Sequence, residues 1–88
     1  MEKPYSDIVS ENRIMRTFDQ SVSDEELVWH RDDCDRIVEI IKSDGWMFQY
    51  DNELPFHLRE GDFLKIKEGE WHRTIKGEGD LTIIITNM

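Results

Sequence analysis

A histidine and an aspartate stand two residues apart, at positions 30 and 32, in a segment that ends one run of strand-forming residues and opens another. Side chains two residues apart on a strand lie on the same face, so His30 and Asp32 should point the same way, together with Val28. Imidazole nitrogen and carboxylate oxygen are both ligands that borderline divalent metals accept. The pair is therefore a candidate for part of a metal site, and a hydrated surface turn is the alternative structure for the same residues.

A further candidate ligand follows two glycine turns in the segment Gly61–Arg73. The turn at Gly61 opens a short strand, Gly69 lies in the next turn, and His72 stands where a new strand should begin. An imidazole at the beginning of a strand can meet side chains from neighbouring strands.

This second segment resembles the second conserved motif of the cupin family. In that motif a glycine is followed by five residues, a proline, one residue, a second glycine, two residues and a histidine. Gly61, Gly69 and His72 occupy the matching positions. Lys67 stands in place of the proline, which shapes the turn and binds nothing.

The first segment resembles the first cupin motif, which has two histidines one residue apart, then a glutamate and then a glycine turn. His30 matches the first histidine and Asp32 replaces the second. Arg36 stands at the glutamate position, counted back from the turn that contains Gly45. The resemblance covers residues 26–86.

The resemblance implies a metal site formed by His30, Asp32 and His72. Two histidines and one carboxylate are also the ligand set of non-haem iron oxygenases, which leave open positions for substrate and dioxygen. Fe(II) is therefore the first cofactor expected, with Mn, Ni and Zn as alternatives. A cupin that has lost its metal and keeps a polar pocket is the competing interpretation.

Arg36 should point into the pocket beside Asp32. It can form an ion pair with that carboxylate, which would compete with metal ligation, or it can bind an anionic substrate, since a guanidinium fits a carboxylate with two hydrogen bonds. Arg36 is thus the candidate substrate-binding residue. His57 is expected to face outward, and Cys34 to be passive because reactive thiols need positively charged surroundings and its neighbours Asp33 and Asp35 are acidic.

The elements that must position these residues are short runs rich in β-branched and aromatic residues, separated by glycine and aspartate turns. The predicted strands are Arg13–Phe18, Glu26–His30, Arg36–Lys42, Gly45–Tyr50, Phe56–Leu58, Asp62–Lys67, Trp71–Lys76 and Leu81–Thr86. This rhythm predicts an all-β sandwich or barrel. With the resemblance, it predicts a small cupin-type jelly-roll β-barrel of about eight short strands. We expect one domain over residues 1–88, with a core of about 13–86 and an N-terminal extension or arm of 1–12.

The composition limits the partners. The 88 residues carry a formal net charge of -9, which disfavours nucleic acid and anionic membranes. The one cysteine excludes an intramolecular disulfide, and no apolar run near the N-terminus is long enough for a signal peptide or a membrane span. These features predict a soluble cytoplasmic protein.

Three functions stay open. The first is a metal-dependent enzyme of dioxygenase, isomerase or lyase type that acts on a small polar molecule. The second is a binding or sensing module whose pocket holds a small ligand without chemistry. The third is a structural dimerisation domain: Trp29 and Trp71 each precede a candidate ligand, so they should lie on the opposite face and could form an apolar patch. Cupins commonly pair through a sheet, and a homodimer is therefore expected.

Overall fold

The computed structural model describes residues 5–23 and 27–88. Within them the protein contains eight strands and no helix. The strands in chain order are β1 (Tyr5–Ser10), β2 (Arg13–Phe18), β3 (Arg36–Lys42), β4 (Met47–Tyr50), β5 (Phe56–His57), β6 (Phe63–Ile66), β7 (His72–Ile75) and β8 (Leu81–Asn87).

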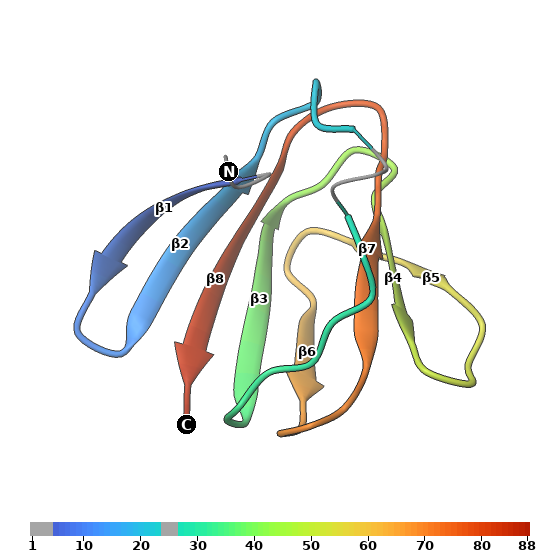
Figure 1. Ribbon diagram of the computed structural model, residues 1–88. Coiled ribbons are helices and arrows are strands. Elements are labelled where there is room, and N and C mark those ends of the chain that lie inside the picture. The colour runs from blue at the N-terminus through green and yellow to red at the C-terminus, as the bar shows by residue number, and fades with distance from the viewer. Residues whose placement is uncertain (1–4, 24–26) are drawn as a thin grey trace.

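The strands form two antiparallel sheets that lie on either side of the molecule (Figure 1). The larger sheet has the order β1-β2-β8-β3-β6, and the smaller has the order β5-β4-β7. Most neighbours are distant in sequence, so each sheet is assembled by chain crossovers, as in a jelly roll. The all-β jelly-roll prediction is confirmed, with the sheets of the described residues kept as two hydrogen-bonded units rather than one closed barrel.

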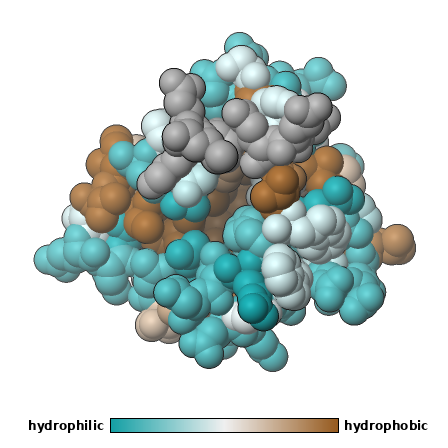
Figure 2. Space-filling view, in the orientation of Figure 1, coloured by the Kyte–Doolittle hydropathy of each residue, from teal (hydrophilic) through white to brown (hydrophobic). Residues whose placement is uncertain are grey.

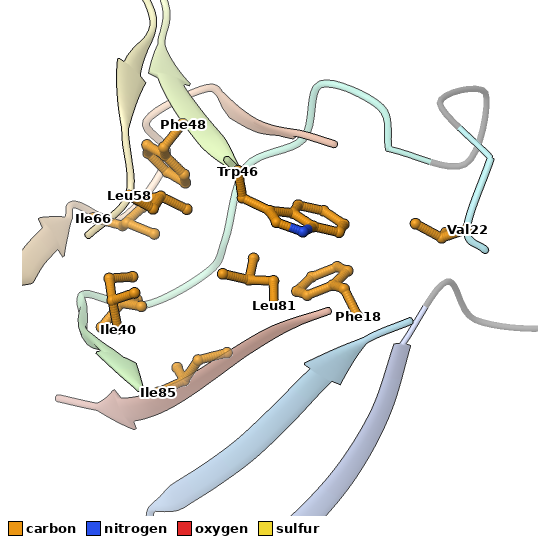
Figure 3. Packing of buried hydrophobic residues seen from close by; sticks show 10 residues of the cluster. Phe18, Val22, Ile40, Trp46, Phe48, Leu58, Ile66, Leu81 and Ile85 are labelled. Carbon is orange, nitrogen blue, oxygen red and sulfur yellow. The ribbon is translucent and has the colours of Figure 1, made fainter. Parts of the chain in front are cut away.

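The core lies between the two sheets, where inward-facing side chains from both meet (Figure 3). Its buried members are Phe18, Val22, Val38, Ile40, Trp46, Phe48, Leu58, Ile66, Leu81 and Ile85. Trp46 is fully buried, and its indole Nε1 donates a hydrogen bond of 2.7 Å to the carbonyl of Gly79. The indole therefore keeps its polar atom satisfied while it supplies the largest buried side chain of the core.

Strand alternation decides which side chains reach this core. In β3, Val38 and Ile40 are buried, and in β8, Leu81 and Ile85 are buried while Thr82 between them is only partly covered. The register pairs Val38 with Ile85, so apolar side chains of adjacent strands lie together on one face. The inward face of the larger sheet is thus continuous across its central strands.

The strand boundaries agree with the sequence prediction to within two residues for seven strands. The prediction of a strand over Glu26–His30 was wrong for its described part, 27–30, and Glu26 lies outside the described residues. Only His30 makes strand-like contact there, in an isolated bridge with His72. Val28 and Trp29 are exposed, and no regular ladder forms along the described part of this segment.

The sequence prediction contained no strand before Arg13. Tyr5–Ser10 nevertheless forms β1, which pairs along its whole length with β2 at the edge of the larger sheet. Nearly all of β1 is exposed, so it shows little of the apolar alternation that marks a half-buried strand. Of these residues Tyr5 packs against the core, with its ring 5.4 Å from that of Phe18.

None of the described residues belongs to a helix of sufficient length and apolarity to span a membrane.

Candidate metal centre

The three predicted ligands come together at one end of the space between the sheets. His30 lies in the chain that leads to β3, Asp32 follows it, and His72 is the first residue of β7. His30 and His72 exchange both backbone hydrogen bonds, of 3.0 and 2.9 Å. This bridge holds the first segment against the strand that carries the second histidine.

The glycine turn before β7 positions the aspartate. The amide of Gly69 donates a 2.9 Å hydrogen bond to the carbonyl of Asp32. Gly69 has a φ of 76° and Gly61 a φ of 88°, both in the left-handed region that favours glycine. The backbone conformation at these two positions of the cupin-like segment therefore favours glycine over other residues. One of the two glycines, Gly69, also contacts the candidate site through its hydrogen bond to Asp32.

The potential ligand atoms of His30, Asp32 and His72 all lie within 4.8 Å of one another. His72 Nε2 is 3.4 Å from Asp32 Oδ2, and the two imidazole rings meet edge to face at 4.3 Å between centroids. His72 is buried, Asp32 is partly buried and His30 is exposed. The group is thus open to solvent on the side of His30.

Backbone carbonyls orient both imidazoles. His72 Nδ1 lies 2.8 Å from the carbonyl oxygen of Glu70, and His30 Nδ1 lies 3.1 Å from that of Val28. A carbonyl oxygen only accepts, so each Nδ1 is the protonated nitrogen that donates. In the neutral rings Nε2 then carries the free lone pair, which is the state a metal-binding histidine needs.

The pKa of His72 is lowered from its ordinary value, chiefly because burial disfavours the charged imidazolium. The neighbouring His30 and the positive charge of Arg36 lower it further, whereas the hydrogen bond to Glu70 and the charge of Asp32 raise it. The net direction keeps His72 neutral at neutral pH. Its Nε2 is therefore available as an acceptor or a ligand.

Asp32 provides the test of whether these residues fit a metal. Its Oδ2 is buried and has no hydrogen-bond partner within the described part of the chain. A lone pair of neutral His72 faces this oxygen at 3.4 Å, and two electron-rich atoms at that distance need a cation or a proton between them. The donor set therefore fits a divalent metal of borderline character, which accepts imidazole and carboxylate together.

Arg36, in β3, meets the same aspartate from the other side. Its Nη1 lies 3.3 Å from Asp32 Oδ1, which confirms the ion pair that the sequence analysis expected. The contact uses one nitrogen of the guanidinium, and Arg36 Nε is buried without a hydrogen-bond partner among residues 5–23 and 27–88. Asp32 thus offers one oxygen to Arg36 and the other to His72.

A cavity of about 350 Å³ adjoins the site. Its wall is mostly apolar, and the polar exceptions are Tyr5, Arg16, His30, Asp32, Arg36, His72 and Thr74. In Figure 2 hydrophobic surface lies in a recess at the centre of the face shown, with hydrophilic atoms around it. The candidate ligands therefore border a small apolar pocket rather than a polar cleft.

Arg16, which was not among the residues predicted from sequence, lines the cavity from β2. Arg16 is ion-paired with Asp7 through two hydrogen bonds of 2.9 and 3.0 Å. The alternation of β2 could have revealed it, because Ile14, Arg16 and Phe18 share one face of that strand. An arginine between two apolar residues on the inward face of a strand was the sequence feature that could have indicated a residue of the cavity wall.

The other residues singled out from the sequence do not line the cavity. His57 is exposed in β5, as expected, and does not line the cavity. Cys34 is partly buried, with Sγ 3.7 Å from the side-chain oxygen of Asn87. Trp29 and Trp71 are 39% and 42% exposed, in agreement with their expected outward orientation.

No protein-family model and no curated protein matches the chain. Solved structures do. A cupin domain from Bordetella pertussis superposes with a TM-score of 0.62 at 16% identity, over 100% of this chain and 98% of that one. KdgF from Halomonas sp. superposes with a TM-score of 0.72 at 15% identity, over 94% of this chain and 76% of that one.

HppE in its FeII form, in complex with substrate, superposes with a TM-score of 0.70 at 14% identity. The match covers 100% of this chain and 55% of the HppE chain, so the protein corresponds to about half of that structure. Likeness at such identities is a likeness of fold. The chain has the cupin fold, with a His-Asp-His group that could hold a metal.

Proposed function

We propose that this protein binds a divalent metal ion through His30, Asp32 and His72 and acts on a small molecule held in the adjoining cavity. The observation that carries the proposal is the buried Asp32 Oδ2, which lacks a hydrogen-bond partner among the described residues and faces a histidine Nε2 at 3.4 Å. The structural neighbour HppE in its FeII form supports Fe(II) as the first choice. Mn, Ni and Zn are the alternatives, because availability as well as affinity selects the ion.

A metal held by three protein ligands supplies Lewis-acid or oxygen-activating chemistry at its open positions. The chain itself supplies the rest. The carbonyls behind His30 and His72 fix the orientation of both imidazoles, and the apolar wall excludes water from the bound molecule. The exposed side of His30 is the route by which ion and ligand enter.

Metal content and metal-induced stabilisation test this function. Untagged protein should carry up to one equivalent of metal by elemental analysis. In anaerobic thermal unfolding, Fe(II), Ni(II) or Zn(II) should raise the Tm, because a ligand that binds only the folded state stabilises it. The proposal is refuted if the purified protein contains no stoichiometric metal and none of these ions shifts its Tm.

Two single-histidine variants form a matched pair for this test. His30→Ala removes an exposed ligand and should abolish the shift of Tm without emptying the core. His57→Ala removes an exposed histidine outside the cavity and should leave the shift intact. Equal shifts in both variants would place the metal elsewhere.

A binding module without chemistry is the second candidate function, and the ion pair between Arg36 and Asp32 favours it. That pair occupies one oxygen of the only carboxylate in the His-Asp-His group. A pocket of this kind can hold a small ligand with Arg36 as its polar anchor. Binding of a ligand by metal-free protein, with an affinity that added metal does not change, would favour this function over the enzyme.

A further inference from the structure

The two arginines that line the cavity differ in how their donors are used. Arg16 is held by Asp7 in a fork of two hydrogen bonds and also lies over the ring of Tyr5, at 3.7 Å from its centroid. Arg36 makes one 3.3 Å contact with Asp32 and leaves its Nε buried and unpaired among the described residues. The cavity therefore contains one guanidinium with donors to spare, and it lies beside the candidate metal centre.

The charges at this end of the cavity do not balance once a metal is present. A divalent ion and Arg36 are both positive, and among the described residues Asp32 is the only acidic one in the cavity wall. Arg16 is neutralised by its own partner, Asp7. Excess positive charge in an apolar pocket is unfavourable unless a bound anion compensates it.

The remainder of the cavity selects against a fully polar ligand. Val38, Ile40, Leu64, Ile83 and Ile85 are among the many apolar residues of its wall. Its volume of about 350 Å³ lies near the lower end of the range for small-molecule pockets, about 300–1,000 Å³. A compact apolar body fits such a space, and its polar group must lie at the end that holds the metal site.

We propose that the ligand of this pocket is a small amphipathic carboxylate, with its carboxylate bound by Arg36 beside the metal and its hydrocarbon part in the apolar cavity. The inference rests on the proposed metal site and narrows its substrate class. The guanidinium fork matches a carboxylate geometrically, and the free Nε–H provides a donor that no described residue uses.

Isothermal titration calorimetry of Ni(II)-loaded protein tests the proposed class of ligand with three probe molecules. Hexanoate carries both features, hexanamide keeps the chain length without the charge, and acetate keeps the charge without the chain. We expect hexanoate to bind at least tenfold more tightly than either of the others. Equal affinity for hexanoate and hexanamide overturns the anionic part of the inference, and equal affinity for hexanoate and acetate overturns the apolar part.

Charge-matched variants identify the anchor. Arg36→Gln should weaken hexanoate binding at least tenfold, and Arg36→Lys should retain part of the affinity. Arg59→Gln makes the same change of charge at an exposed position outside the cavity and should bind hexanoate as the unaltered protein does. Loss of affinity in Arg59→Gln equal to that in Arg36→Gln would mean that net charge rather than Arg36 governs binding.

Metal content is measured in each sample, so that the two proposals fail separately. Protein that holds no metal refutes the proposed function. Unaltered protein that holds metal but binds hexanoate no better than hexanamide refutes only the carboxylate inference. Circular dichroism of Arg36→Gln and Arg36→Lys excludes unfolding as the cause of a lost affinity.

Discussion

At the scale of single residues, Asp32 is the centre of the site because two kinds of partner meet it. Arg36 contacts its Oδ1 at 3.3 Å, and His72 Nε2 lies 3.4 Å from its Oδ2. A positive guanidinium stabilises the carboxylate in metal-free protein and repels a metal ion in loaded protein. Arg36 therefore has opposite effects on the stability of the fold and on the affinity for metal.

Arg36→Gln should tighten metal binding. Removal of the positive charge that contacts Asp32 removes its repulsion of a bound ion, so we expect at least about a fivefold gain in affinity. Competition with a chromophoric chelator measures it. A weaker affinity in the variant would instead show that Arg36 is needed to orient Asp32.

The metal-free protein should lose stability as the pH falls below about 6.5. The folded-state pKa of His72 is lowered by burial, so below its ordinary value of 6.5 the unfolded chain binds more protons than the folded one. The free energy of unfolding in a chelator, measured by urea denaturation between pH 7.5 and 5.5, should fall with pH. His72→Asn should flatten this slope and His57→Ala should preserve it. If the free energy of unfolding of His72→Asn depends on pH as steeply as that of the original protein, another group causes the dependence.

At the scale of elements, the site depends on two turns and one bridge. The Gly69 turn binds the backbone of Asp32, and the bridge between His30 and His72 joins the irregular segment to β7. No regular strand lies along residues 27–35. These few backbone hydrogen bonds therefore set the distances between the candidate ligands.

Gly69→Ala should weaken both the fold and the site. A Cβ at this position meets nothing within 4 Å, so the cost comes from the φ of 76° and is about 1–2 kcal/mol for a residue with a side chain. Urea denaturation should show this loss, and metal titration a lower affinity because the turn holds Asp32. Gly69→Asn is the control, since asparagine tolerates the left-handed region better. An Ala variant as stable as the original protein would contradict the argument.

At the scale of the whole molecule, a strongly acidic chain encloses a pocket with a cationic side chain, Arg36, whose Nε has no partner among the described residues. The formal net charge is -9, yet Asp32 is the one acidic residue of the cavity wall within the part of the chain that the structure describes. The acidic groups lie mainly on the exterior, where solvent screens them. The outer surface also carries Trp29 and Trp71, which are covered in part by Arg73 and Arg31 at 5.0 and 5.2 Å from the ring centroids.

We expect the protein to be a homodimer that uses this tryptophan surface. Two half-exposed indoles on one side of the molecule offer the aromatic anchors that interfaces commonly use. Light scattering coupled to size exclusion should give twice the mass of 10.6 kDa. Trp29→Ser combined with Trp71→Ser should shift the protein toward monomer, whereas Leu54→Ser, at an exposed site elsewhere, should not. A monomer at all concentrations would refute the prediction.

The sequence by itself determined the features that depend on neighbours along the chain. Glycines at 61 and 69 with left-handed φ, the alternation in β3 and β8, and the inward direction of Asp32 and Arg36 follow from local backbone geometry. Local pattern of this kind was sufficient to predict an all-β sandwich or barrel, and the jelly roll and the set of three candidate ligands followed from the resemblance to the cupin motifs.

Only the tertiary structure decided what depends on contacts between distant segments. β1 forms because β2 offers it an edge, and its exposed side chains give no apolar pattern of their own. The predicted strand over Glu26–His30 reduces, in its described part, to the single bridge at His30, because its only ladder partner there is His72. The meeting of His72 with Asp32, the spare donor of Arg36 and the apolar cavity beside them all arise from packing two sheets face to face, which no local spacing encodes.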